Sequence, residues 1–222
     1  MQLILDTANL DKIEEYLSYL PVHGVTTNPS ILKKEDEVQF SEHFKEIRKL
    51  IGEDRSLHIQ VVSLDYEGIL EDAYRILDLV DENVYIKIPV SKEGLKAIKT
   101  LKKENINVTA TAIYSKIQAL IAMDLGADFL APYVNRMMNL DSDPYDLIRS
   151  LAMQIERTNS STKLLGASFK NINQVVRATE VGSHFVTVGS DVIDTFTENA
   201  NIEKAVHDFA GDWYSMFNTD TI

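Results

Sequence analysis

The chain alternates short apolar runs with longer amphipathic stretches, and this alternation constrains its fold more than any other feature. The short runs are rich in β-branched and aliphatic residues, as expected of strands buried on both faces. We predict eight strands, at residues 3–7, 24–28, 58–63, 84–90, 107–113, 129–134, 163–169 and 184–189. The segments between them have helical spacing, at residues 10–19, 36–50, 67–80, 93–103, 116–125, 144–157 and 173–181.

Strand-then-helix units of this size build a parallel sheet, because parallel neighbours need a crossover connection. Eight such units close naturally into a (β/α)8 barrel, and 222 residues lie near the lower end of the size range of that fold. An open doubly wound sheet is the competing architecture, but no glycine-rich dinucleotide loop follows the first run. The sequence therefore predicts an α/β protein, a (β/α)8 TIM barrel forming one domain over residues 1–222.

After the eighth predicted strand, a segment at about residues 201–217 carries a single apolar helical stripe. The stripe consists of Ile202, Ala205, Val206, Phe209, Trp213 and Phe217. We expect an additional C-terminal helix here. The favoured interpretation is that this helix closes the bottom or wall of the barrel. The alternative is that its aromatic stripe docks on a neighbouring subunit.

Composition restricts the partners of the protein. The formal net charge is -12 and the pI is near 4.8, so nucleic acid and anionic membranes are poor partners. The chain has no cysteine, which excludes disulfides, thiolate metal sites and a cysteine nucleophile. The first residues lack a basic region followed by an apolar stretch, and no apolar run approaches membrane length. We expect a soluble, cytoplasmic protein.

Lys87 is chemically the most informative residue of the chain. It lies in the run Val84-Tyr85-Ile86-Lys87-Ile88-Pro89-Val90, which predicts a buried strand. An ammonium group in such a strand is costly, because burial disfavours the charged form. Burial can bring the pKa of a lysine from about 10.4 to about 7–8, and the neutral amine can then attack a ketone to form a Schiff base. The alternative is a strand-end lysine that reaches water or pairs with a carboxylate.

Nearly every predicted strand brings a hydrogen-bonding side chain to its C-terminal end, where barrels of this kind carry their active sites. In chain order these residues are Asp6, Thr26, Thr27, Asn28, Gln60, Ser63, Lys87, Thr109, Thr111, Tyr133, Asn135, Arg136, Ser168 and Lys170. Single members have ordinary explanations: Asp6 could cap the following helix, Asn28 could begin one, and Arg136 could be a surface charge. Their convergence around one lysine predicts an active site instead.

Six segments of the chain form a distinctive set. They are Leu5-Asp6-Thr7, Gly24-Val25-Thr26-Thr27-Asn28-Pro29-Ser30, Ile86-Lys87-Ile88-Pro89-Val90, Glu93-Gly94-Leu95, Ala131-Pro132-Tyr133-Val134-Asn135-Arg136 and Ala167-Ser168-Phe169-Lys170. Together they resemble the small transaldolase family, and within it the fructose-6-phosphate aldolase branch. Transaldolases are expected to carry Glu and Phe in place of Gln60 and Tyr133, and Gly-Arg in place of Asn135-Arg136. The chain departs from the family pattern at Val188-Gly189-Ser190, where a Leu-Pro-Leu-like stretch is expected.

The resemblance, which runs over the whole chain, implies roles for these residues. Lys87 is the expected Schiff-base lysine. The other expected catalytic residues are Asp6, Gln60, Thr111 and Tyr133, and the expected substrate-binding residues are Thr26, Asn28, Arg136, Ser168 and Lys170. Tyr133 is the expected acid/base, through a water held by Gln60 and Thr111. Arg136, with Ser168 and Lys170, is the expected phosphate site.

The activity implied by the resemblance is that of a class I aldolase, which cleaves fructose 6-phosphate reversibly to dihydroxyacetone and glyceraldehyde 3-phosphate. One alternative is a transaldolase, which transfers a dihydroxyacetone unit between sugar phosphates in the pentose phosphate pathway. Another is a sugar-phosphate-binding barrel without activity, which the presence of Lys87, Gln60, Thr111 and Tyr133 disfavours. The family also implies a ring-based homo-oligomer, with a decamer as one expected form.

No metal or cofactor is expected, because an iminium ion does the work that zinc does in metal-dependent aldolases. The histidines agree with this expectation, since they are scattered without ligand-like spacing, at His23, His43, His58, His184 and His207. His58 and His184 open predicted strands at the rim opposite the expected active site. We therefore expect both to be structural.

Overall fold

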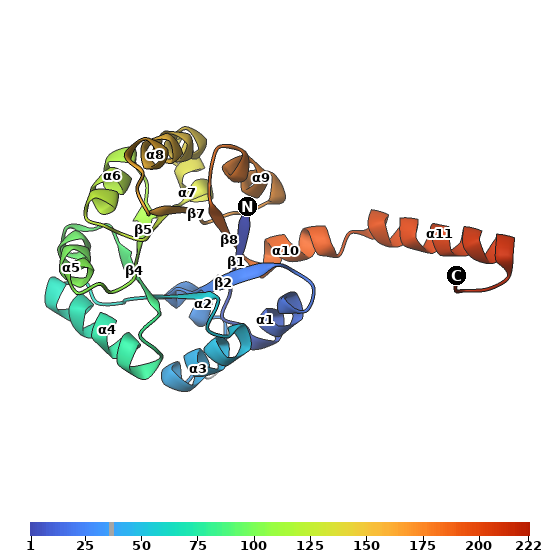
Figure 1. Cartoon of the computed structure of the whole chain (residues 1–222), viewed down its shortest axis with the longest axis horizontal. Coiled ribbons are helices and arrows are strands. Elements are labelled where there is room, and N and C mark those ends of the chain that lie inside the picture. The colour runs from blue at the N-terminus through green and yellow to red at the C-terminus, as the bar shows by residue number, and fades with distance from the viewer. Residues whose placement is uncertain (36–37) are drawn as a thin grey trace.

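The predicted apolar runs form a closed barrel of eight parallel strands in the order β1-β2-β3-β4-β5-β6-β7-β8 (Figure 1). The computed structural model describes residues 1–35 and 38–222. The strands are β1 (Gln2–Asp6), β2 (Val22–Thr26), β3 (Ser56–Gln60), β4 (Tyr85–Pro89), β5 (Val108–Ile113), β6 (Phe129–Pro132), β7 (Lys163–Gly166) and β8 (Phe185–Val188). The prediction of a (β/α)8 TIM barrel is confirmed.

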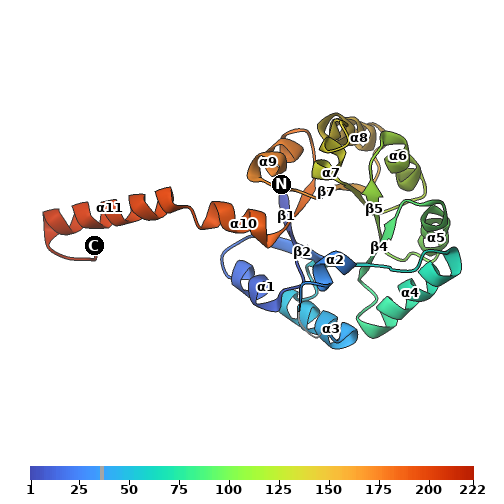
Figure 2. The same ribbon diagram turned by 180° about the vertical axis from the view of Figure 1, so that it is seen from behind.

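Helices surround the barrel, and Figures 1 and 2 show this ring from its two ends. They are α1 (Leu10–Leu17), α3 (Phe40–Ile51), α4 (Tyr66–Leu79), α5 (Lys92–Lys103), α6 (Lys116–Asp124), α8 (Pro144–Thr158), α9 (Ile172–Glu180) and α10 (Ser190–Thr197). The helix predicted at residues 36–50 begins at Asp36, which lies outside the described residues, and α3 begins at Phe40. The helix α10 was not predicted.

Several predicted strands extend too far at their C-terminal ends, because the chain turns into short helices there. Residues 28 and 134 were predicted as strand, but α2 (Pro29–Leu32) and α7 (Val134–Met138) follow β2 and β6 almost directly. The start of α2 has a local cause: Asn28 Oδ1 accepts hydrogen bonds from the backbone N–H groups of Ser30 and Ile31, and Pro29 is the first helical residue. These turns build the rim at the C-terminal ends of the strands.

In strand β4, alternate side chains point outward to the helices and inward to the barrel interior. Ile86 and Ile88 are fully buried and pack into the apolar cluster that the helices share with the strands. Tyr85 and Lys87 alternate with them and therefore point into the barrel. Tyr85 contacts an interior cluster whose buried members are Ile4, Phe129 and Leu165. The barrel interior is thus packed with side chains beneath Lys87.

His58 is part of this lower interior. Its ring stacks on Tyr85 at 4.8 Å between centroids and meets Phe129 edge-on at 5.0 Å. Its two ring nitrogens lie 2.7 Å from Thr109 Oγ1 and 2.9 Å from Ser56 Oγ. Burial lowers the pKa of His58 to about 3, so the ring is neutral at physiological pH. The predicted structural role of His58 is confirmed, as is that of His184, whose Nδ1 accepts from the Leu164 N–H.

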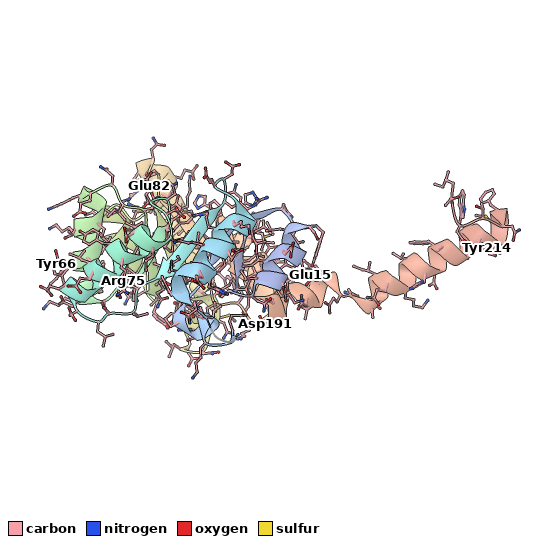
Figure 3. The ribbon with its side chains drawn as sticks, turned by 90° about the horizontal axis from the view of Figure 1, so that it is seen from below. Glu15, Tyr66, Arg75, Glu82, Asp191 and Tyr214 are labelled. Carbon is pink, nitrogen blue, oxygen red and sulfur yellow. The ribbon has the colours of Figure 1, made fainter. Side chains whose placement is uncertain are left out.

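The C-terminal helix α11 (Ala200–Phe217) begins one residue before the predicted range, and it projects away from the barrel (Figures 1 and 3). None of its described residues is buried, and Val206 and Phe209 are 59% and 71% exposed. The interpretation that this helix closes the barrel bottom or wall is therefore wrong. An amphipathic stripe requires an apolar partner but does not specify which one. In the described part of the chain, no helix combines the length and apolarity needed to cross a membrane.

Candidate active site

A cavity of about 290 Å³ lies at the C-terminal ends of the strands. It brings together seven of the predicted site residues, which are Asp6, Asn28, Lys87, Tyr133, Arg136, Ser168 and Lys170. Thr26 and Thr111 are fully buried and bind two of these wall residues, Asp6 and Tyr133. Gln60 is the β3 neighbour of Lys87 in the strand register, but it does not line this cavity and instead lines a separate pocket with residues of α3 and α4. Nine of the ten predicted site residues thus gather at one mouth of the barrel.

Lys87 lies on the floor of the cavity with its side chain only 3% exposed. Its Nζ donates a hydrogen bond to the Thr27 carbonyl at 3.2 Å. Burial lowers the pKa of Lys87, Asp6 acts in the opposite direction, and the positive charge of Arg136 lowers the pKa further. A lysine that reaches water would be more exposed, so that part of the alternative is wrong for Lys87; a carboxylate, that of Asp6, does act on the lysine through its charge.

The long lysine side chain has room because its neighbours in the barrel interior are small. Side chains in barrels of this kind form layers supplied by alternate strands. Alternation along β2, β4, β6 and β8 places Thr26, Lys87, Ala131 and Thr187 in one layer, and all four are buried. The Oγ1 atoms of Thr26 and Thr187 lie 2.6 Å apart, so side chains from β2 and β8 meet inside the barrel.

Asp6 ends β1 beside Lys87. Thr26 Oγ1 donates a hydrogen bond to Asp6 Oδ1 at 2.6 Å. Burial raises the pKa of Asp6, while the charge of Lys87 and the bond from Thr26 lower it. The explanation of Asp6 as a helix cap is wrong, because Asn9 accepts the Lys12 N–H and caps α1. Asp6 is therefore free to act inside the cavity.

Tyr133, which follows β6, lines the cavity, and Thr111 Oγ1 donates to its Oη at 3.1 Å. Burial raises the pKa of Tyr133, and the hydrogen bond from Thr111 lowers it.

Gln60 alternates along β3 with the inward-facing His58, so its side chain also enters the barrel. Gln60 Oε1 is buried and has no hydrogen-bond partner among the described residues. An unpaired buried acceptor is a place where a water or a substrate group can bind.

Arg136 stands at the rim in α7 with its guanidinium 4.5 Å from the centre of the Tyr133 ring. A hydrogen bond to Tyr114 raises the pKa of Arg136. Ser168, after β7, has φ 61, a left-handed conformation that is costly for a residue with a side chain. Lys170 Nζ lies 3.6 Å from Asp191 Oδ2, and both side chains are 66% exposed. This rim therefore presents cationic groups and a hydroxyl to an incoming anion.

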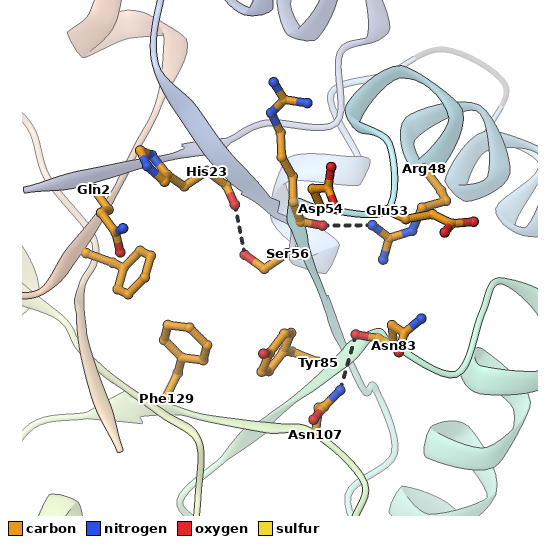
Figure 4. A pocket seen from close by; sticks show the side chains of 12 residues that line it. Gln2, His23, Arg48, Glu53, Asp54, Ser56, Asn83, Tyr85, Asn107 and Phe129 are labelled. Atoms are coloured by element: carbon orange, nitrogen blue, oxygen red, sulfur yellow. Dashed lines mark hydrogen bonds between the residues drawn. The ribbon is translucent and has the colours of Figure 1, made fainter. Parts of the chain in front are cut away.

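A second cavity, of about 400 Å³, lies at the opposite end of the barrel (Figure 4). Aromatic rings of Tyr85, Phe129 and Phe185 line it, together with polar side chains such as Asn83 and Asn107. Several of its polar groups bind one another: Asn107 Nδ2 donates to the Asn83 carbonyl. None of the predicted site residues lines it. The described residues also contain no group of three or more His, Asp or Glu side chains arranged to hold a metal ion.

The sequence analysis assigned no role to several residues that line or adjoin this cavity. Lys34 and Asp191 line the cavity, but exposed charges at the end of α2 and in the first turn of α10 give no signal in the sequence. Thr187 did give one, because it is a polar residue inside a buried apolar strand, as Thr26 is. Gly189, in the stretch that departs from the family pattern, also lines the cavity.

The chain is similar to proteins of a known family. The family model described as Transaldolase/Fructose-6-phosphate aldolase matches residues 3–220. A protein named probable fructose-6-phosphate aldolase, from Streptococcus pneumoniae, is 49% identical over 222 residues, which is 100% of both chains. A protein named probable transaldolase, from Kosmotoga olearia, is 34% identical over 213 residues, 96% of each chain. Another of that name, from Methanococcus maripaludis, is 35% identical over 218 residues, 98% of this chain and 100% of the relative.

The match to the family model extends from β1 into the residues after α11 and includes every residue of the cavity wall. An identity of 49% over the full length of both chains is far above what a shared barrel fold alone would require. The chain belongs to the transaldolase/fructose-6-phosphate aldolase family.

Proposed function

We propose that this protein is a class I aldolase that cleaves fructose 6-phosphate reversibly to dihydroxyacetone and glyceraldehyde 3-phosphate through a Schiff base on Lys87. The observation that carries the proposal is the lysine itself, an amine with a lowered pKa, 3% exposed, on the floor of a polar cavity. The full-length relative named probable fructose-6-phosphate aldolase supports the same activity.

The reaction follows from the chemistry of a neutral amine. Lys87 attacks the C2 carbonyl of the ketose, and the carbinolamine loses water to give an iminium ion. The iminium withdraws electrons, so the C3–C4 bond breaks with its electron pair held as an enamine, while the C4 hydroxyl loses its proton and glyceraldehyde 3-phosphate leaves. Protonation of the enamine at C3 and hydrolysis then release dihydroxyacetone and the free lysine.

In this proposal Tyr133 moves the C4 proton. Thr111 donates to the phenol oxygen, which stabilises the phenolate and leaves the phenol proton free to point into the cavity. Gln60 Oε1, unpaired among the described residues, would accept a hydrogen bond from a water that links Tyr133 to the substrate. A glutamine can only orient such a water, whereas a glutamate could exchange protons with it.

Asp6 and Asn28 would hold the donor half of the substrate. Asn28 Oδ1 already accepts two backbone N–H groups, so its Nδ2 is the group left for the ligand, and a substrate oxygen must accept from it. Asp6, as a carboxylate, can accept from a donor hydroxyl and stabilise the positive charge of the iminium beside it. Asn28 would therefore donate a hydrogen bond to a substrate oxygen, and Asp6 would accept one from a substrate hydroxyl.

Arg136, Ser168 and Lys170 would bind the phosphate group. A guanidinium presents two parallel donors to phosphate oxygens. The ring of Tyr133 beneath it restricts its orientation, because the two lie 4.5 Å apart. Lys170 would exchange its exposed contact with Asp191 for the phosphate, and little would be lost since exposed ion pairs are weak.

Covalent trapping tests the proposed function directly. Borohydride added with dihydroxyacetone should reduce the iminium and leave the donor attached to Lys87, as located by peptide mass mapping. Lys87→Arg should abolish both trapping and fructose 6-phosphate cleavage, because arginine offers no free amine. Lys99→Arg, on the outer helix α5, serves as the matched control and should retain both. An adduct on another lysine, or none, would refute the mechanism.

A transaldolase activity is the second candidate, because relatives of 34% and 35% identity carry the name probable transaldolase. It would use the same lysine but pass the enamine to an aldose phosphate. Release of glyceraldehyde 3-phosphate from fructose 6-phosphate should be measured alone and then with erythrose 4-phosphate. Release that depends on erythrose 4-phosphate would favour transfer, and release without it would favour the aldolase.

We further propose, from the family resemblance, that the protein works in the cytoplasm as a ring-based homo-oligomer and that it handles sugar phosphates connected to the pentose phosphate pathway. The exposed stripe on α11 supports assembly, since Val206 and Phe209 would otherwise remain in water. The net charge of -12 supports a small-molecule substrate over nucleic acid.

A further inference from the structure

Thr187 begins a chain of buried hydrogen bonds that ends on Asp6. It is 2% exposed, and its Oγ1 lies 2.6 Å from Thr26 Oγ1. Thr26 is fully buried, and its Oγ1 lies 2.6 Å from Asp6 Oδ1. Strand β1 lies between β2 and β8, so three neighbouring strands supply the chain. Two short bonds between buried groups indicate a fixed connection rather than a chance contact.

The protonation state of Asp6 determines which group donates and which accepts in each of these two hydrogen bonds. A carboxylate can only accept, so the Thr26 proton is used in the bond to Asp6 when Asp6 is ionised. The proton between the two threonines must then come from Thr187. If Asp6 were protonated, both bonds could reverse, with Thr187 as the final acceptor. The direction of the hydrogen bonds thus follows the charge on Asp6.

We propose that Thr187 is a positioning residue of this aldolase: by donating to Thr26 it directs the Thr26 hydroxyl at Asp6 and keeps the Asp6 carboxylate ionised beside Lys87. The inference rests on the proposed function. Consecutive hydrogen bonds polarise one another in a region of low dielectric constant, so the outer bond strengthens the inner one. Burial raises the pKa of Asp6 and the bond from Thr26 lowers it, so losing the outer bond would let burial dominate.

The charge on Asp6 matters because the iminium on Lys87 is positive. An adjacent carboxylate stabilises that cation, whereas a neutral carboxylic acid does so far less. The other ionisable groups that act on or with Asp6 come from several elements, and they are Lys34 after α2, Tyr133 after β6, Arg136 on α7 and Asp191 on α10. None of them is changed by a substitution at Thr187, so the effect of that substitution on Asp6 can be isolated.

The test compares the pH dependence of kcat/KM for fructose 6-phosphate in the wild type, Thr187→Val and Thr187→Ser. Valine keeps the shape of threonine but cannot donate, so its acid limb should move to higher pH by about half to one unit, while kcat/KM above that limb stays close to the wild type. Serine retains the hydroxyl and should restore the wild-type profile. Thr187→Ala, which also lacks the donor, should reproduce the shift and replaces Thr187→Val should that variant not fold.

Thr109→Val is the matched control, because Thr109 is a fully buried threonine whose hydroxyl binds His58 and not Asp6. It should leave the acid limb in place. The inference would be overturned by any of three results. The Thr187→Val profile could superimpose on that of the wild type, the Thr187→Ser profile could shift as far as that of Thr187→Val, or Thr109→Val could show an equal shift. Borohydride trapping at Lys87 reports the charge on Asp6 without requiring cleavage: a less ionised Asp6 raises the pKa of Lys87 less, so Thr187→Val should move the trapping midpoint to lower pH, as Asp6→Asn does, and Thr187→Ser should not. A wild type that traps dihydroxyacetone but does not cleave fructose 6-phosphate therefore refutes the proposed activity and leaves the role of Thr187 measurable.

Discussion

At the scale of single residues, the proposed chemistry depends on an amine that the fold keeps out of water. Lys87 is 3% exposed, and burial is the main cause of its lowered pKa. Asp6 is also buried near Lys87, and its charge raises the pKa of the lysine. Because the proposed mechanism requires the neutral amine of Lys87, it predicts that the balance between burial and Asp6 sets the pH range of activity.

Schiff-base formation should therefore depend on pH in a defined direction. The rate of borohydride trapping with dihydroxyacetone should rise with pH and level off above the pKa of Lys87, with a midpoint below the ordinary value of 10.5. The charge of Asp6 raises the pKa of Lys87, so Asp6→Asn should move the midpoint to lower pH. Trapping rates across a pH series measure both. A midpoint that moves upward in Asp6→Asn would contradict the assignment.

Tyr133 should control bond cleavage but not Schiff-base formation. Tyr133→Phe removes the phenol, so ketose cleavage should fall by about 10²–10⁴ while trapping at Lys87 persists. Adding Gln60→Glu supplies a group that can exchange protons, so transfer to erythrose 4-phosphate should rise relative to cleavage. Tyr145→Phe is a control with an equally buried ring outside the cavity. Unchanged cleavage in Tyr133→Phe would make Tyr133 a packing residue.

At the scale of elements, the turn from β4 into α5 holds the lysine strand in place through a close approach that only glycine permits. A Cβ at Gly94 would lie 1.9 Å from the Pro89 carbonyl oxygen. Ser91 Oγ accepts the Gly94 N–H at 3.0 Å and caps the helix. The tight turn and the cap together set where α5 begins relative to the strand that carries Lys87.

Gly94→Ala should therefore lower the melting temperature, because either the turn or the helix start must move. The cost should be about 1–3 kcal/mol, as for overpacking of a dense interior. Gly211→Ala is the matched control: nothing lies within 4 Å of an added Cβ there, and alanine favours a helix over glycine. Thermal unfolding followed by circular dichroism should show no loss for Gly211→Ala. Equal melting temperatures for the two variants would rule out the close approach at Gly94.

The elements also show where prediction from sequence succeeds and where it fails. The strands were found because each is an apolar run buried on both faces, a property that the residues of the strand carry themselves. Their C-terminal ends were placed too late, since Asn28 and Tyr133 are buried or half-buried like strand residues but begin α2 and α7. Lys34 was missed because a lysine on a rim gives the same signal as any solvated charge. Whether such a lysine belongs to a site depends on the residues that face it in the folded protein, which the sequence around it does not show.

At the scale of the whole molecule, α11 is the element whose place the sequence could not determine. Its apolar stripe was recognised, but the partner of the stripe lies outside the helix and leaves no pattern within it. In Figure 3 the helix extends beyond the barrel, with Tyr214 near its far end. The rings of Trp213 and Phe217 contact each other at a tilt, with 4.3 Å between their centroids, and form an aromatic surface near the end of the helix.

We predict that a second copy of the chain covers this surface. Sedimentation should show a wild-type species well above 25.1 kDa, and truncation before Asn201 should lower both the assembly state and the stability. Phe209→Ala should weaken assembly, and loss of an aromatic interface anchor costs about 2 kcal/mol or more. Lys204→Ala, an exposed substitution on the same helix, is the control and should leave assembly unchanged. A wild-type species near 25.1 kDa would refute this prediction.

The packed interior beneath Lys87 has a consequence for how this protein can change. Rings of Tyr85, His58 and Phe129 fill the lower barrel, and none of them lines the upper cavity. Substitutions at the upper rim therefore leave these contacts intact, and variation can accumulate there without unfolding the molecule. A barrel divided in this way can acquire new substrate preferences through a series of folded variants, because changes at the rim need not disturb the packing that holds the barrel together.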